Sequence, residues 1–277
     1  MSPRIGLLAA AALGWLLAAC ANGTGEIGDI KSVKYVEEDL TRWMHLPYAS
    51  LPPPRFIQVT EEGRYNPSGG EPNLKIKAEY EIVAVNGAFS TMRVRTSGQA
   101  RRTTTSYKSQ MGIHDMGSSY SGGWGENSRR ILEVVPGRFL PLNPVVKSRF
   151  PELQGVSAAE LSHEFTWKIR IGQGAGSERW FRISSLVTDM ATTPVIVNDR
   201  EYLIDAYLID YSVTNLQNIY KNELKLWYVP VLGWYAQYEL RSEGRRGVWR
   251  SVGDRISFEV TQEALAEFLK YASPAGT

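Results

Sequence analysis

The chain has 277 residues, of which 43% are hydrophobic and 11% aromatic, and its formal net charge is +2. This length and apolar content are enough for one large core or two modest ones. The near-neutral charge gives no electrostatic basis for binding nucleic acid, and a single cysteine, Cys20, excludes a disulfide within the chain.

Residues 1–19 have the pattern of a secretory signal peptide. Arg4 precedes an apolar run from Ile5 to Leu17, and small alanines follow that run. The run is too short for a transmembrane helix, which takes about 20 residues. We therefore expect that the chain is exported and that this segment is removed.

The four residues Leu17-Ala18-Ala19-Cys20 resemble the lipobox of bacterial lipoproteins. The resemblance implies that Cys20 becomes the acylated N-terminus and that the protein contacts the membrane through its acyl chains. Two or three chains anchor a protein far more firmly than one. In that family Asp after the cysteine retains the protein in the inner membrane. Here Ala21 follows, which implies attachment to the outer membrane on its periplasmic face.

The region after the cysteine predicts a spacer and then a short helix. Residues 20–36 begin with glycine and small polar residues, which indicates a lipidated tether. Val33–His45 has apolar residues at helical spacing and predicts a short N-terminal helix. Pro52-Pro53-Pro54 marks a linker or the rim of a domain.

From Phe56 onward the dominant hydrophobic period is two, which is typical of β-strands. In Leu74–Val85 apolar residues alternate with Lys and Glu, and Asn86-Gly87 predicts a tight turn into Ala88–Arg95. We assign residues 37–110 to an N-terminal β-rich part.

Residues 111–129 are rich in glycine and serine and interrupt this period. They predict a loop between the N-terminal part and a C-terminal antiparallel part over residues 130–277. The loop either connects the two parts or carries aromatic side chains for binding, with Tyr120 and Trp124 as the candidates.

The C-terminal part contains further alternating runs, which predict strands. These are Glu164–Ile171, Arg179–Val187, Thr193–Val197, Glu201–Val213, Glu223–Val229, Trp234–Arg241, Val248–Val252 and Arg255–Val260. Asn198-Asp199 predicts a turn, and Thr261 caps a closing helix over Gln262–Tyr271 that buries Leu265, Phe268 and Leu269. The expected fold class is mainly β, an antiparallel meander forming a half-barrel or sandwich, with a short N-terminal and a short C-terminal helix.

The segment from Trp227 to Trp234 is similar to a strand, turn, strand pattern of uncharacterised periplasmic β proteins with half-barrel folds. Pro230 and Gly233 are suited to the turn. Trp227, Tyr228 and Trp234 form either an aromatic lip on a ligand cavity or part of the core. We expect Trp227 in the core and Trp234 partly exposed at the edge of the turn.

A basic turn contains Arg245 and Arg246. Arginine binds phosphate and carboxylate well, which fits lipopolysaccharide or peptidoglycan as a partner. The alternative is a solvated hairpin tip neutralised by Glu239 and Glu243.

Catalytic motifs are incomplete in this sequence. The chain has only three histidines and no HExxH motif, so we expect no metal and no cofactor. Gly117-Ser118-Ser119-Tyr120-Ser121 lacks the final glycine of the nucleophile elbow. The sequence favours a non-enzymatic envelope binding or assembly component with other envelope proteins, lipopolysaccharide or peptidoglycan as partners. The alternatives are a carrier of an amphiphilic ligand in a β cavity and a serine hydrolase of the cell envelope that uses the serine cluster with His114-Asp115.

Overall fold

The computed structural model describes residues 58–66, 74–86, 89–96, 102–109, 115–121, 128–144, 152–171, 177–218, 220–244 and 247–275. Most of these residues lie in strands of one sheet, which confirms the mainly β class. The strands are β1 (Gln58–Asn66), β2 (Leu74–Asn86), β3 (Phe89–Thr96), β4 (Arg102–Ser109), β5 (Asp115–Ser121), β6 (Ser128–Phe139), β7 (His163–Ile171), β8 (Ser177–Val197), β9 (Arg200–Asn215), β10 (Lys221–Val229), β11 (Trp234–Gly244), β12 (Gly247–Glu259) and β13 (Ser273–Pro274). The helix expected at Val33–His45 lies outside the described residues.

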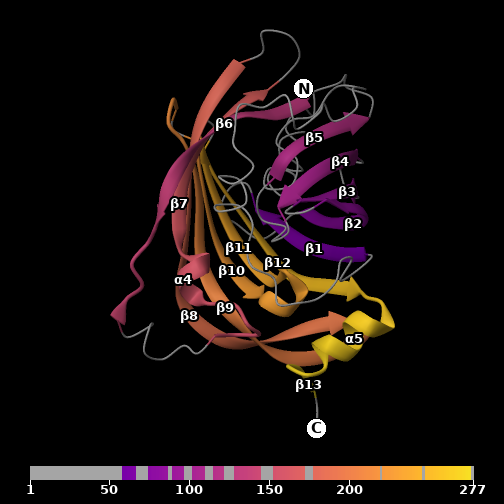
Figure 1. Cartoon of the computed structure of the whole chain (residues 1–277). Helices are drawn as coiled ribbons and strands as arrows, with labels where there is room; N and C mark the ends of the chain where they lie inside the picture. Colours follow the sequence, from indigo (N-terminus) through magenta and orange to yellow (C-terminus); the bar gives the residue numbers. More distant parts are fainter. Residues whose placement is uncertain are drawn as a thin grey trace.

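The strands follow one another as the expected antiparallel meander. Each strand from β1 to β12 pairs with the next one along the chain. β12 also pairs antiparallel with β1, so the two ends of the meander meet. In Figure 1, β1–β5 lie on one side of the molecule and β7–β11 form a curved wall opposite them. This curved sheet confirms the class expected for a half-barrel or sandwich.

The sheet divides near Gly253. β11 pairs with β12 only as far as Tyr238 opposite Gly253. Beyond this point β12 pairs parallel with the end of β8, where Phe258 lies opposite Val197. The strands β8 to β12 therefore close a smaller ring at the end of the molecule that carries the helix α5 (Gln262–Phe268; Figure 1).

A tight turn joins β8 to β9 at Asn198 and Asp199, as predicted. Their φ angles are +47° and +61°, a left-handed conformation that Asn and Asp tolerate and that this hairpin turn requires. The strand before the turn is longer than expected, because Arg179–Val187 and Thr193–Val197 form one continuous β8. A bulge between Val187 and Asp189 lets the pairing with β9 continue through the intervening residues.

The segment 111–129 differs from the expected loop, because β5 lies within it. β5 pairs with β4 from Thr103 opposite Ser121 onward, and with β6 over a shorter stretch. Backbone pairing on both edges stabilises a strand that the side-chain pattern does not show. One sheet thus runs across the expected boundary between the two parts. A hairpin joins β2 and β3 as expected, but Asn86 still belongs to β2 and lies opposite Phe89, so the connection begins one residue later than the predicted Asn86-Gly87 turn.

The core is rich in large aromatic side chains. Those that are fully buried are Trp234, Tyr80, Tyr207, Tyr228, Phe165, Phe258 and Phe268. Thr261 caps α5 as predicted, because its Oγ1 accepts a hydrogen bond from the backbone N–H of Ala264 at 3.2 Å. Leu269, expected to be buried, is 43% exposed. The buried residues of α5 are Ala264 and Phe268, and the helix ends before Leu269.

A connecting segment before β7 is fastened to the smaller ring by polar contacts. It includes the short helix α4 (Ala158–Leu161). The amide of Gln154 donates to the carbonyl of Asp205 at 2.9 Å and accepts from the N–H of Val231 at 2.7 Å. The hydroxyl of Tyr207 donates to the carbonyl of Val156 at 2.8 Å. These bonds connect β9, the 3-10 helix η2 (Pro230–Leu232) and the segment in front of α4.

Candidate functional site

The turn between β10 and β11 is the site that the sequence singled out. Pro230 begins η2, and Gly233 ends it with a φ of +61° in the left-handed region. The N–H of Gly233 donates to the carbonyl of Pro230 at 2.9 Å. Both residues therefore build the turn as predicted, and the chain enters β11 directly at Trp234.

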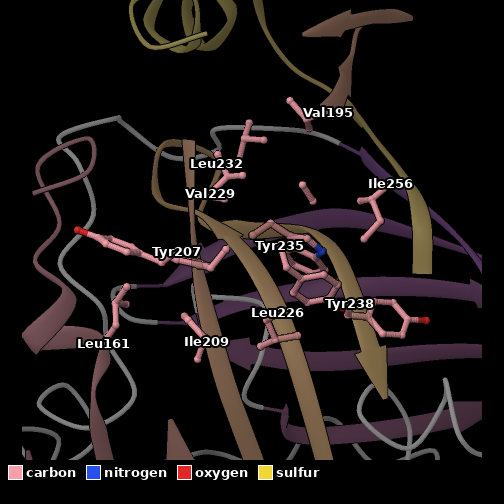
Figure 2. Packing of buried hydrophobic residues seen from close by; sticks show 14 of the residues in the cluster. Leu161, Val195, Tyr207, Ile209, Leu226, Val229, Leu232, Tyr235, Tyr238 and Ile256 are labelled. Carbon is pink, nitrogen blue, oxygen red and sulfur yellow. The ribbon is translucent and has the colours of Figure 1, made fainter. Parts of the chain in front are cut away.

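The aromatic residues around this turn pack against one another inside the molecule. The ring centroids of Tyr80 and Trp234 are 5.4 Å apart, and those of Trp234 and Tyr235 are 5.5 Å apart. Tyr235 meets Tyr238 edge-on at 5.6 Å. Figure 2 shows Tyr235 and Tyr238 close to Leu226 of β10. Such tilted and edge-on contacts between rings stabilise a core.

The expectation that Trp234 is partly exposed is wrong. Its side chain is 0% exposed, and that of Tyr228 is 1% exposed. Trp234 lies on the same face of β11 as Ala236 and Tyr238, and this whole face is buried. Val231 and Leu232 in the turn are also buried, so the edge of this turn lies inside the fold and Trp234 with it.

Trp227 has the opposite environment from the one expected. It lies on the outer face of β10 and is only partly buried, with Lys225 Nζ 5.7 Å from the centroid of its ring. Tyr228 is its neighbour in sequence, and a bulge separates the two in the pairing with β11. Of the three proposed lip residues, only Trp227 therefore reaches the surface.

The remaining predicted site residues have no described side chains. Tyr120 lies in β5, where only the backbone is described, and Cys20, Trp124, Arg245 and Arg246 fall outside the described residues. These binding roles stay predictions.

Beside the basic turn, the outer face of β10 and β11 carries a network of charges. Arg241 Nη1 lies 3.0 Å from Glu223 Oε2, and Arg241 Nη2 lies 3.2 Å from Glu243 Oε2. Lys221 also pairs with Glu223, and these two cations hold the pKa of the Glu223 carboxyl below its usual value. Exposed pairs of this kind contribute little stability. They show that this face of the sheet is exposed to solvent and that the charge of Arg241 is balanced by Glu223 and Glu243.

His163 is a buried polar residue that the sequence reasoning did not select. It begins β7, stacks on Phe165 with centroids 6.0 Å apart, and its Nδ1 lies 3.3 Å from the carbonyl oxygen of Glu160. Burial lowers the pKa of His163 to about 4, so the ring is neutral at physiological pH. In the sequence, only its position between a short helix and an alternating strand could have indicated that this histidine is buried.

Within the described ranges, no group of three or more His, Cys, Asp or Glu side chains is arranged to hold a metal ion. The helices in the described part are all too short or too polar to cross a membrane.

Comparison with known proteins gives few matches. No protein-family model matches the chain, and no curated protein is similar to it. One crystal structure, a "putative exported protein with YmcC-like fold" from Bacteroides fragilis, is similar over 72% of this chain and 94% of its own, with a TM-score of 0.33 and 10% identity. A "putative lipoprotein" from Parabacteroides distasonis is similar over 73% of this chain and 96% of its own, with a TM-score of 0.34 and 9% identity. At these scores the two structures give no information on the function of this protein.

Proposed function

We propose that this protein is a lipoprotein of the outer membrane that faces the periplasm and serves as a non-enzymatic binding or assembly component of the cell envelope. The observation that carries the proposal is the sequence Leu17-Ala18-Ala19-Cys20 at the end of an apolar signal, in a chain with one cysteine. Acylation of Cys20 would use that cysteine and place the β domain within reach of the bilayer.

The described fold supports a binding or assembly role over a carrier. A carrier of an amphiphile needs an apolar cavity. In the smaller ring, the inward side chains of β9, β10 and β11 are instead packed against one another, with Trp234, Tyr228 and Ile209 each at most 1% exposed. The outer face is polar, as Glu223 and Arg241 illustrate.

The surroundings of His163 argue against this histidine as a general base, whereas His114 of the hydrolase alternative lies outside the described residues. A general base near neutral pH requires a titrating group that substrate can reach. His163 is 2% exposed, and burial keeps its pKa at about 4. It is also the single histidine in the described ranges.

Mass spectrometry of the mature N-terminus tests the anchor. We expect the chain to begin at Cys20 and to carry acyl groups, and Cys20→Ser to give unprocessed or unanchored protein. Cleavage at another residue, or an unmodified Cys20 in the wild type, would refute the proposal.

A second experiment tests which of the two membranes holds the protein. Ala21→Asp should move the protein from the outer-membrane to the inner-membrane fraction, as the sorting rule of bacterial lipoproteins implies. Ala21→Ser is the matched control and should leave the distribution unchanged. If wild-type protein fractionates with the inner membrane, the assignment to the outer membrane is wrong and the anchor itself is unaffected.

A further inference from the structure

The hairpin of β8 and β9 extends past its neighbouring strands, and the described strands leave one edge of β8 unpaired. Ser185 is the last residue of β8 that pairs with β7, and Ile196 is the first that pairs with β12. Between these two residues, β8 pairs only with β9 among the described strands. An open edge of this length is a template on which another chain can add a strand.

The register of the hairpin turn determines which residues of β8 direct their backbone N–H and C=O groups to this edge. Val197 and Arg200 close the two-residue turn, so the odd-numbered residues near the end of β8 bond to β9. The even-numbered residues face the other way, and accordingly the N–H of Asn198 donates to the carbonyl of Phe258 in β12 at 2.9 Å. Thr192 and Pro194 therefore present their backbone to the open edge.

The opposite edge of the hairpin, along β9, is covered by the chain itself. The carbonyl of Glu201 accepts from the N–H of Ala275 at 3.1 Å, and Leu203 pairs with Ser273 of β13. The carbonyl of Asp205 accepts from the side chain of Gln154. Alternate residues of β9 thus have partners, and the open edge belongs to β8.

Most backbone N–H groups along the β8 edge are already bonded to nearby side chains or are missing. The N–H of Val187 donates to Ser162 Oγ at 3.1 Å, and the N–H of Met190 donates to Oδ1 of the neighbouring Asp189 at 2.8 Å. Pro194 has no N–H at all. A proline inside a strand is compatible with the sheet only where its nitrogen faces away from the paired neighbour, as here.

We propose that Asp189 and Pro194 block the β8 edge against strand addition by a second copy of this chain. Asp189 is exposed, places a negative charge at the bulge, and occupies the N–H of Met190. Pro194 is exposed and removes the donor four residues further on. Between them, Thr192 has the one N–H facing the edge for which the described part of the chain provides no acceptor, and one donor is too few to hold an added strand.

The inference goes beyond the proposed function and does not require it. If the protein is anchored through Cys20, its copies share a membrane surface, and protection of an open edge matters more at that high local density. The geometry of the edge is the same in an unanchored chain.

The test uses the full mature chain from residue 20 with Cys20→Ser, so that acyl chains play no part. Asp189→Val with Pro194→Val restores two donors to the edge. The matched control is Asp210→Val with Thr214→Val, which adds the same side chains on β9 where β8 and β10 cover both edges. Sedimentation velocity over a range of concentrations measures self-association, and circular dichroism measures folding.

We expect the Asp189/Pro194 variant to associate at about tenfold lower concentration than the wild type and the control. Adding Thr192→Pro to that variant should weaken the association, because it removes the donor between the two restored ones. The backbone bonds to β9 are kept, and only the side-chain bond from Thr192 Oγ1 to Asp205 Oδ1 at 2.7 Å is lost. If the folded variant sediments like the control, or if Thr192→Pro leaves the association unchanged, the proposal is wrong. If Pro194→Val prevents folding, the single variant Asp189→Val is compared with the wild type and with Asp210→Val in the same sedimentation experiment, and equal sedimentation would refute the proposal.

Discussion

The buried histidine at the start of β7 makes the stability of this protein depend on pH in a defined window. His163 is 2% exposed, and burial holds its pKa at about 4, against 6.5 for an ordinary histidine. The folded state therefore keeps the ring neutral, whereas the unfolded chain takes up a proton as the pH falls below 6.5. Protonation thus favours the unfolded chain, and stability falls with pH until the folded ring also protonates near pH 4.

The size of this effect follows from the two pKa values. A difference of one unit corresponds to about 1.4 kcal/mol, so the full effect is about 3 kcal/mol. Between about pH 7.5 and about pH 4.5, linkage predicts a loss of about 2.5 kcal/mol in the free energy of unfolding from this residue alone. The loss is large enough to separate from the scatter of a denaturation experiment.

Urea unfolding at several pH values, on the wild type and on His163→Gln, measures the effect. Carboxylates also titrate in this window, but they are shared by both proteins and cancel in the difference. We expect the unfolding free energy of the wild type to fall more steeply than that of the variant between pH 6.5 and 4. Parallel curves for the two proteins would refute the reasoning and would mean that His163 is solvated or already charged in the folded state.

Three further predictions test the packing. Trp234→Ala should cost about 3–5 kcal/mol of unfolding free energy and Trp227→Ala only about 1 kcal/mol, as measured by urea unfolding, and equal losses would contradict the assigned burial. Gly253→Ala should destabilise by about 1–3 kcal/mol, because its Cβ would lie 2.0 Å from a neighbouring tyrosine ring. The control Gly244→Ala, whose Cβ would have no atom closer than 3.6 Å, should cost less in the same thermal melts. Gln154→Leu leaves two backbone groups unpaired and should cost about 2 kcal/mol or more, and an unchanged melting temperature would show that water replaces the amide.

Local sequence signals determined much of the strand framework. Alternation of polar and apolar residues predicted Leu74–Val85 within one residue of the observed end of β2. Asn198-Asp199 and Pro230 with Gly233 predicted two turns, because these residue types have the backbone conformations that the turns require. The helix cap at Thr261 was equally local.

The tertiary structure decided which face of each strand is buried and which strands meet across the chain. Trp227 and Trp234 have similar local sequence surroundings, yet one lies on the outer face and the other in the core. Their burial depends on the direction in which the turn sends β11 and on Tyr80, which is distant in sequence. β5 and the middle of β8 are strands because their neighbours pair with them, and this information is not contained in their own residues. The resemblance of Leu17-Ala18-Ala19-Cys20 to a lipobox needs no fold to be recognised. The edge of β8 that the described strands leave unpaired exists only because β7 and β12 leave that strand at different points.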